Sequence, residues 1–149
     1  MNAPENPIKR SDVLKIYTDG ASRKNPGPSA YAFIFVRGEE TIYSTSEYLG
    51  IQTNNTAEYT AVIEALKKAV EYTRWKVEVY SDSELIINQI NGEWRIKDGH
   101  LKDLHNQIIT QITNFKEVKF FHVSRENKFI KEADKLCNEC LDKNLGKSR

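Results

Sequence analysis

Strand-like and helix-like stretches follow one another along this chain in an order that few folds allow. Three stretches in which β-branched and aromatic residues recur come first, with no helical pattern between them, at residues 13–18, 30–36 and 41–49. Helical and strand-like stretches then alternate, over residues 55–72, 76–81, 85–92, 101–112, 117–123 and 131–142. The predicted order is βββαβααβα. Three consecutive strands followed by alternation predict an α/β protein, with the α+β character of a five-stranded mixed sheet on which the helices pack.

Length and composition point to one domain without a strong electric field. The chain has 149 residues and a formal net charge of +1, so a nucleic-acid partner would be held by local basic patches. We expect a flexible N-terminal tail (1–12), one domain (13–143) and a short basic C-terminal tail (144–149). No apolar run approaches the roughly 20 residues of a membrane span, and the N-terminus has no signal-peptide core. We therefore expect a cytoplasmic monomer without a membrane partner.

Four acidic residues stand where predicted strands or helices meet their neighbours. Asp19 follows the first strand and precedes a turn broken by glycine and proline, and Asp82 ends the strand at 76–81. Glu58 lies near the start of a helix, and Asp134 lies early in the last one. Together they would form an oxygen cage for hard divalent cations. The pattern favours metal-dependent phosphoryl chemistry.

Simpler structural roles compete with this interpretation. Asp82 precedes an apolar helix within a Ser-Asp-Ser sequence, which is typical of a helix N-cap. Asp134 would also serve as a solvated helix charge, and Asp19 as a turn residue. For the helix that carries Glu58, Asn54 or Asn55 is a fitting N-cap.

The two cysteines, Cys137 and Cys140, lie three positions apart in a helical pattern. One Cys-x-x-Cys pair without a second is weak support for zinc. We favour a packing role beside Leu136 and Leu141, with redox or metal binding as the alternative.

Five segments in a fixed order resemble the type 1 ribonuclease H family. They are Tyr-Thr-Asp-Gly-Ala-Ser-Arg-Lys-Asn-Pro-Gly-Pro (17–28), Thr-Asn-Asn-Thr-Ala-Glu-Tyr (53–59), Tyr-Ser-Asp-Ser-Glu-Leu (80–85), Asn-Gln-Ile-Asn-Gly-Glu-Trp (88–94) and Ala-Asp-Lys-Leu (133–136). The resemblance extends over residues 14–141. It implies the ribonuclease H-like fold, with helices on both faces of the sheet. It also implies an endoribonuclease that hydrolyses the RNA strand of RNA/DNA hybrids.

In this family the four acids hold the catalytic metal. The resemblance implies two Mg²⁺ ions, with Mn²⁺ as a substitute, and products with 5′-phosphate and 3′-hydroxyl ends. Asp19 would bridge both ions, Glu58 and Asp82 would complete one, and Asp134 the other. Two ions about 3.5–4 Å apart serve the attacking and leaving oxygens of a phosphodiester. Crowding the acids together raises some of their pKa values until metal arrives.

Polar residues beside the acids are the implied substrate contacts. Discriminating RNA from DNA requires groups that hydrogen-bond the 2′-hydroxyl. The resemblance assigns the contacts with the 2′-hydroxyl to Ser22, Lys24 (through its backbone), Asn25, Asn54 and Asn55. It assigns to Thr53 a contact with a phosphate of the DNA strand. Turn formation and capping would also explain these residue types.

Two further positions differ from the usual family pattern or have a competing role. Glu84 stands where the family often carries Gln, and its charge disfavours contact with bases or sugar. Trp94 lies beside basic residues, where many relatives insert a long basic handle. Here the handle is absent, so we expect modest, salt-sensitive hybrid affinity. Trp94 would either contact nucleic acid or pack between two helices.

Many relatives carry a mobile His, or a Glu, in the loop after the fifth strand, where it serves product release. His122 falls within the predicted strand, so Glu126 is our candidate for this auxiliary catalytic role. We assign His100 and His105 to the surface.

Two function classes remain open at this point. The first is the active endoribonuclease, which the presence of all four acids favours. The second is a catalytically weak or inactive hybrid- or RNA-binding module on the same fold. Another two-metal nuclease, such as a resolvase or exonuclease, is disfavoured by the Asp-Gly-x-Ser (19–22) and Thr-Asn-Asn-x-x-Glu (53–58) segments.

Overall fold

The computed structural model describes residues 8–146, and its elements follow the predicted order. The strands are β1 (Val13–Ser22), β2 (Gly27–Arg37), β3 (Glu40–Gln52), β4 (Lys76–Ser81) and β5 (Glu117–His122). The helices are α1 (Asn54–Ala69), α2 (Glu84–Ile90), α3 (Gly99–Ile112) and α4 (Lys128–Asn144). The order βββαβααβα is confirmed.

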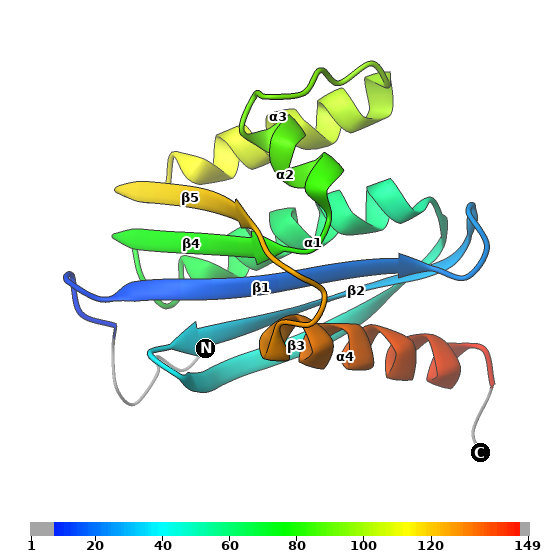
Figure 1. The fold of residues 1–149 in the computed structure, drawn as a ribbon, viewed down its shortest axis with the longest axis horizontal. Coiled ribbons are helices and arrows are strands. Elements are labelled where there is room, and N and C mark those ends of the chain that lie inside the picture. The colour runs from blue at the N-terminus through cyan, green and yellow to red at the C-terminus, as the bar shows by residue number, and fades with distance from the viewer. Residues whose placement is uncertain (1–7, 147–149) are drawn as a thin grey trace.

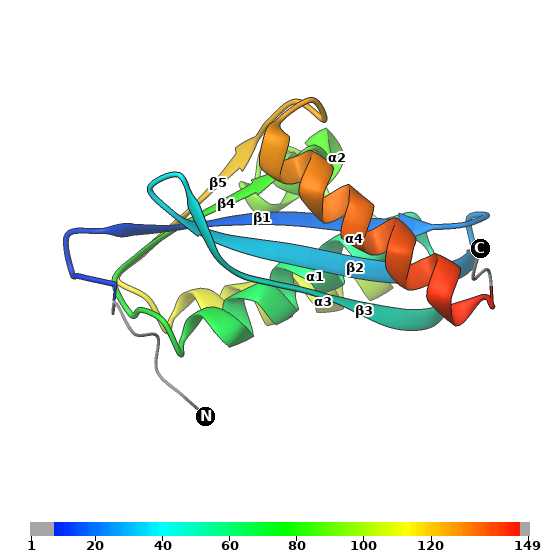
Figure 2. The same cartoon turned by 90° about the horizontal axis from the view of Figure 1, so that it is seen from below.

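The five strands form one mixed sheet in the order β3-β2-β1-β4-β5 (Figure 1). β1 and β2, and β2 and β3, are antiparallel, whereas β1 and β4, and β4 and β5, are parallel. Helix α4 packs on β1, β2 and β3 on one face of the sheet. On the other face α1 packs on β1 and β2, and α3 packs on α1 (Figure 2). The predicted mixed sheet with helices on both faces is thereby confirmed.

Two apolar clusters, one on each face, hold these layers together. The larger lies between the sheet and the α1–α3 layer, and includes Leu14, Phe35 and Leu66. The smaller lies under α4, where Phe129 and Ile130 pack against Ile34 of β2. Burying one such side chain contributes about 1.5–3 kcal/mol. Because β2 is covered on both faces, residues 29–36 are buried without interruption.

The first strand is longer than its hydrophobic pattern predicts. Its parallel pairing with β4 ends at Tyr17 and Tyr80, but its antiparallel pairing with β2 continues to Ser22. The prediction that Asp19 follows the end of a strand was therefore wrong. Asp19 lies inside β1, just beyond the point where β4 stops.

The N-terminal boundary also differs from the expected tail. Ile8 is buried in the cluster beneath α1, and the Arg10 guanidinium lies 3.9 Å from the centre of the Trp75 ring. Residues 8–12 thus contact the domain. The rest of the predicted N-terminal tail, and residues 147–149 of the C-terminal one, lie outside the described residues. Helix α4 extends to Asn144, one residue past the predicted domain end.

Across residues 8–146, none of the helices combines the length and the apolar character that crossing a bilayer requires.

Candidate active site

The four predicted acids line one open cavity of about 620 Å³. They come from four elements: Asp19 from β1, Glu58 from α1, Asp82 from the residue after β4, and Asp134 from α4. The parallel strands β1 and β4 both end their pairing at this edge, and α1 and α4 approach it from opposite faces. The fold therefore gathers all four carboxylates that the sequence singled out.

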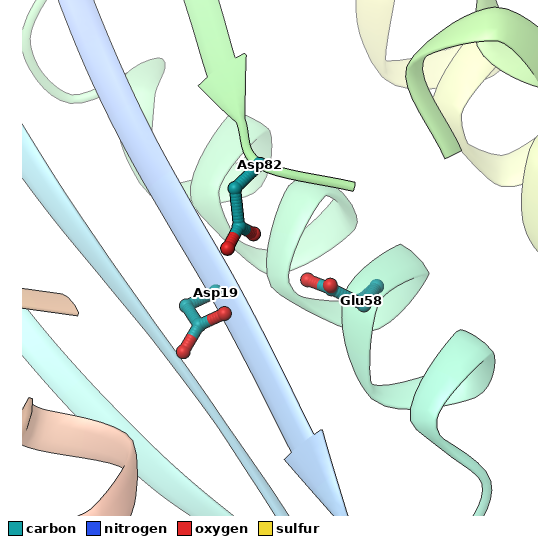
Figure 3. Close-up of side chains that lie close together, drawn as sticks. All are labelled: Asp19, Glu58 and Asp82. Atoms are coloured by element: carbon teal, nitrogen blue, oxygen red, sulfur yellow. The ribbon is translucent and has the colours of Figure 1, made fainter. Parts of the chain in front are cut away.

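Three of these acids are close enough to share a cation. Asp19, Glu58 and Asp82 each offer a carboxylate oxygen, and the three oxygens lie within 4.8 Å of one another (Figure 3). The Oδ2 of Asp19 is buried and has no hydrogen-bond partner. A buried oxygen without a donor is costly, and a hard cation would satisfy it. The donor set consists of carboxylates, which suits Mg²⁺ or Mn²⁺.

The electrostatics of the site agree with this fit. Burial, followed by the negative charges of Asp82 and Asp134, raises the pKa of Asp19 to about 8. Burial and the charges of Asp19 and Asp82 also raise the pKa of Glu58 well above its ordinary value, against the effect of a hydrogen bond from Gly20. The expectation of raised pKa values is confirmed for these two acids. A bound cation would remove much of the repulsion.

Gly20 allows the close approach of β1 and α1 that this arrangement needs. A Cβ at this position would lie 2.4 Å from the Ala57 carbonyl carbon and 2.4 Å from the Glu58 nitrogen. The Gly20 N–H donates to Glu58 Oε1 at 2.9 Å. The residue beside Asp19 thus both admits helix α1 and orients the carboxylate of Glu58.

The structure excludes the alternative role considered for Asp82 but not the one considered for Asp134. Ser83, rather than Asp82, is the N-cap of α2, and its side chain accepts from Ile86 N at 3.3 Å. The capping role considered for Asp82 was therefore wrong. Asp134 is exposed, as a solvated helix charge would be, yet it lines the cavity beside Asp19.

A loop stabilised by side-chain hydrogen bonds borders the acids. The Ser22 N–H donates to Asn54 Oδ1 at 2.8 Å, and the Asn54 N–H donates to Asn25 Oδ1 at 3.0 Å. The Ser22 hydroxyl, which has one proton to donate, lies within hydrogen-bond distance of the carbonyl of Lys24 and of that of Gln52, the latter at 3.1 Å. Lys24 has a φ of 73°, in the left-handed region. The turn-forming role considered for these residues is confirmed, and Ser22, Asn54 and Asn55 also line the acid cavity.

Comparison with known proteins places this arrangement in a family. The family model described as "Reverse transcriptase-like" matches residues 17–140. A ribonuclease HI of Halobacterium salinarum is 37% identical over 134 residues, which are 89% of this chain and 66% of the relative. A ribonuclease H of Chlorobium phaeovibrioides is 33% identical over 87% of this chain and 96% of its own length. This chain belongs to the type 1 ribonuclease H family.

Solved ribonuclease H structures share its fold. LC11-RNase H1, solved in complex with an RNA/DNA hybrid, superposes with a TM-score of 0.83 at 36% identity, covering 89% of this chain and 99% of that one. The chain corresponds to only part of its longer relatives: it spans 66% of the Halobacterium protein and 35% of a mycobacterial bifunctional protein. The predicted family and fold are both confirmed.

Thr53 and Asn25 lie at a smaller cavity of about 290 Å³. It opens where the N-termini of α1 and α3 meet, and Asn55 and His100 also line it. Thr53, and not Asn54 or Asn55, is the N-cap of α1, and its Oγ1 accepts from the Thr56 N–H at 3.1 Å. Helix N-termini favour anions, but the carboxylate residue Asp98, the N-cap of α3, also lines this cavity. The phosphate contact of Thr53 stays a prediction.

Glu84 and Trp94 lie outside both cavities. Glu84 is the exposed first residue of α2. Trp94 is 45% exposed, so the alternative that it packs between two helices was wrong. A nucleic-acid contact for either residue stays a prediction.

The residues near the loop after β5 that line the acid cavity do not include the predicted Glu126. Glu126 is exposed and pairs with Lys131 at 3.0 Å, and it does not line the acid cavity. His122 and Arg125 line it instead. Parallel pairing places His122 opposite Ser81, next to Asp82. The sequence does not specify this register, so it gave no signal for His122.

Cys137 is a packing residue, as we favoured. It lies on the buried face of α4, and its thiol donates to the Asp19 carbonyl at 3.5 Å. Burial raises its thiol pKa further above the ordinary value. Cys140 is half-buried. Among the residues that the structure describes, neither cysteine belongs to a group of three or more metal-ligating side chains.

Proposed function

We propose that this ribonuclease H is an endoribonuclease that hydrolyses the RNA strand of RNA/DNA hybrids with two Mg²⁺ ions, for which Mn²⁺ would substitute. The products would carry 5′-phosphate and 3′-hydroxyl ends. One observation carries the proposal: the oxygens of Asp19, Glu58 and Asp82 lie within 4.8 Å, with a buried Asp19 oxygen lacking any donor.

The chain's own residues divide the work between holding metal and orienting its ligands. Asp19, Glu58 and Asp82 would hold one ion, and Asp19 with Asp134 the second. When bound, the ions supply an activated water and neutralise the departing 3′ oxygen. The Gly20 N–H fixes the Glu58 carboxylate before metal arrives, so less ordering is needed when the site fills.

Hybrid recognition would use the loop beside the acids. Ser22, Asn54 and Asn55 face the cavity, and their donor and acceptor groups suit a 2′-hydroxyl. The backbone of Lys24 and the side chain of Asn25 shape the same loop, and Thr53 would contact a phosphate of the DNA strand. The hybrid bound to LC11-RNase H1 supports a hybrid duplex as the partner class.

The decisive experiment is cleavage of a labelled RNA/DNA duplex in Mg²⁺, beside RNA/RNA and DNA/DNA duplexes and an EDTA blank. We expect cutting of only the hybrid's RNA strand, with 5′-phosphate products. Asp19→Asn should abolish cutting, whereas Asp103→Asn, on the exposed face of α3, should not.

A different result would select the alternative function. Binding of the hybrid without cutting, in Mg²⁺ or Mn²⁺, would indicate the catalytically inactive binding module. Full cutting by Asp19→Asn would contradict the metal assignment. A monomeric state and a cytoplasmic location stay predictions, and size-exclusion chromatography with light scattering tests the first.

A further inference from the structure

One of the four acids depends on an element that the other three do not share. Asp19 and Asp82 belong to the paired strands β1 and β4, and Glu58 is tied to β1 by the Gly20 hydrogen bond. Asp134 lies on α4, which covers the opposite face of the sheet. The place of its carboxylate therefore depends on how α4 is held along its length.

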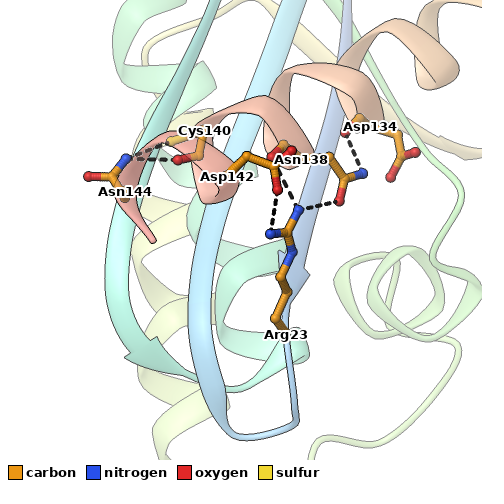
Figure 4. Close-up of polar contacts among 6 residues, drawn as sticks. All are labelled: Arg23, Asp134, Asn138, Cys140, Asp142 and Asn144. Atoms are coloured by element: carbon orange, nitrogen blue, oxygen red, sulfur yellow. Dashed lines mark hydrogen bonds and ion pairs between the residues drawn. The ribbon is translucent and has the colours of Figure 1, made fainter. Parts of the chain in front are cut away.

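Apolar packing holds α4 on the sheet along its length, because Cys137 and Leu141 are buried as well as the residues near its N-terminus. Phe129, Ile130 and Ala133 are buried against β1 and β2. Asp134, Asn138 and Asp142 follow at intervals of four residues, which places them in one row along the helix. That row lies beside the loop after β1 (Figure 4).

Arg23 of this loop contacts two residues of the row, Asp142 and Asn138. Its Nη1 lies 2.6 Å from Asp142 Oδ1, and its Nη2 donates to the carbonyl of Asn138 at 3.2 Å and to Asn138 Oδ1 at 3.3 Å (Figure 4). Asn138 Nδ2 in turn donates to the carbonyl of Asp134 at 3.0 Å. The contacts form a continuous path from the loop to the backbone of the metal-ligand candidate.

The same loop contains residues assigned to the substrate. Arg23 follows Ser22, and its N–H donates to the Pro28 carbonyl at 2.8 Å, which closes the loop. A displacement of Arg23 would therefore disturb both α4 and the loop after β1, which contains the predicted substrate contacts. Its guanidinium is a planar fork that one ammonium cannot replace at both contacts.

From this path we propose that Arg23 is a positioning residue: with Asn138 and Asp142, it fixes α4 so that Asp134 faces the metal site. The proposal rests on the proposed function, since it assigns Asp134 to metal binding. Arg23 itself does not line the acid cavity.

Two other roles for Arg23 predict different effects of substitutions on Mg²⁺ binding and on KM. If the positive charge of Arg23 merely repelled the cation, Arg23→Ala would tighten Mg²⁺ binding and Asp142→Asn would weaken it. If Arg23 bound a substrate phosphate, Asp142→Asn would free it and lower KM. Positioning requires both variants to weaken Mg²⁺ binding.

The test is an Mg²⁺ titration without substrate, followed by the backbone amide resonance of Asp134 in NMR spectra. We expect Arg23→Ala and Asp142→Asn each to raise the Mg²⁺ concentration at half-saturation about 10-fold, the low end for residues that orient metal ligands. The double variant should show little more than either single one, since both break one connection. Arg23→Lys should fall between wild type and Arg23→Ala.

Lys67→Ala is the matched control, because it removes another exposed ion pair, with Glu64 at 3.3 Å on α1. It should leave Mg²⁺ binding unchanged. Circular dichroism confirms that each variant is folded, and Asp142→Asn, the mildest change, carries the test if Arg23→Ala unfolds.

Hybrid cleavage supplies the second readout, with a lower kcat at saturating hybrid and KM changed less than twofold. Unchanged Mg²⁺ half-saturation in both variants, or shifts of opposite sign, would overturn the proposal. The titration needs no nuclease activity. A wild-type protein that binds Mg²⁺ without cutting would therefore contradict the proposed function and leave the positioning role supported or refuted on its own data.

Discussion

Replacing Asp19 by Asn should stabilise the metal-free protein while abolishing its activity. Burial and neighbouring acids raise the pKa of Asp19 from 3.8 to about 8. Between these values the folded state keeps a proton that the unfolded state has released, so the free energy of unfolding falls as pH rises. The penalty is absent below about pH 4 and complete above about pH 8.

The magnitude follows from the two pKa values. At about 1.4 kcal/mol for each pH unit between them, an ionised Asp19 costs ~5–6 kcal/mol in the folded protein. The amide of Asp19→Asn escapes this cost, but it occupies a site where one acid oxygen has no partner, which costs ~1–3 kcal/mol. We therefore expect a net gain of ~2–5 kcal/mol at about pH 8.5 and almost none at about pH 5.

Urea denaturation in EDTA at both pH values, followed by circular dichroism, measures this difference. Asp103→Asn, an exposed acid of α3, is the control and should change little. Mg²⁺ at 100 times its dissociation constant should stabilise the wild type by about 2.7 kcal/mol, and Asp19→Asn far less. An Asp19→Asn variant that is less stable than wild type at the higher pH would refute the reasoning, as would an equal difference at both pH values.

Three further variants test other parts of the structure. Gly20→Ala should lower the free energy of unfolding by ~1–3 kcal/mol or more, because its Cβ would meet the Ala57 backbone at 2.4 Å; an unchanged urea midpoint would contradict this. Glu126→Ala should slow hybrid cleavage far less than loss of any of the four acids, and an equal loss in steady-state kinetics would assign it a catalytic role. Tyr59→Phe should cost ~1–2 kcal/mol in thermal unfolding, since it removes the buried hydrogen bond to Gln89 at 2.7 Å; a neutral result would mean that water replaces the hydroxyl.

The order of elements was predictable because hydrophobic periodicity is a local property. The four acids were predictable for a related reason: acidic residues at the ends of buried strands and helices have few structural uses. The position of Asp19 within β1 was not, since it depends on β2 continuing to pair after β4 has stopped. Strand length is set by the partner as much as by the strand's own residues.

Contacts made across the fold escaped the sequence entirely. Glu126 was chosen by its place in a loop, but the register of β5 brings His122 and Arg125 to the cavity instead. A packing role was considered for Trp94 because it lies between two predicted helices in the sequence, but its side chain is 45% exposed. Arg23 meets Asn138 from 115 positions away, and no spacing rule predicts such a pair.

The gathering of the site from both faces of the sheet has a consequence for biosynthesis. Asp19, Glu58 and Asp82 leave the ribosome long before Asp134, which lies on the helix that closes the smaller apolar cluster. A growing chain therefore holds three mutually repelling carboxylates without the fourth acid or the layer that supports it. Complete metal binding waits for α4, so the full stabilisation that metal provides comes only after this helix has been synthesised.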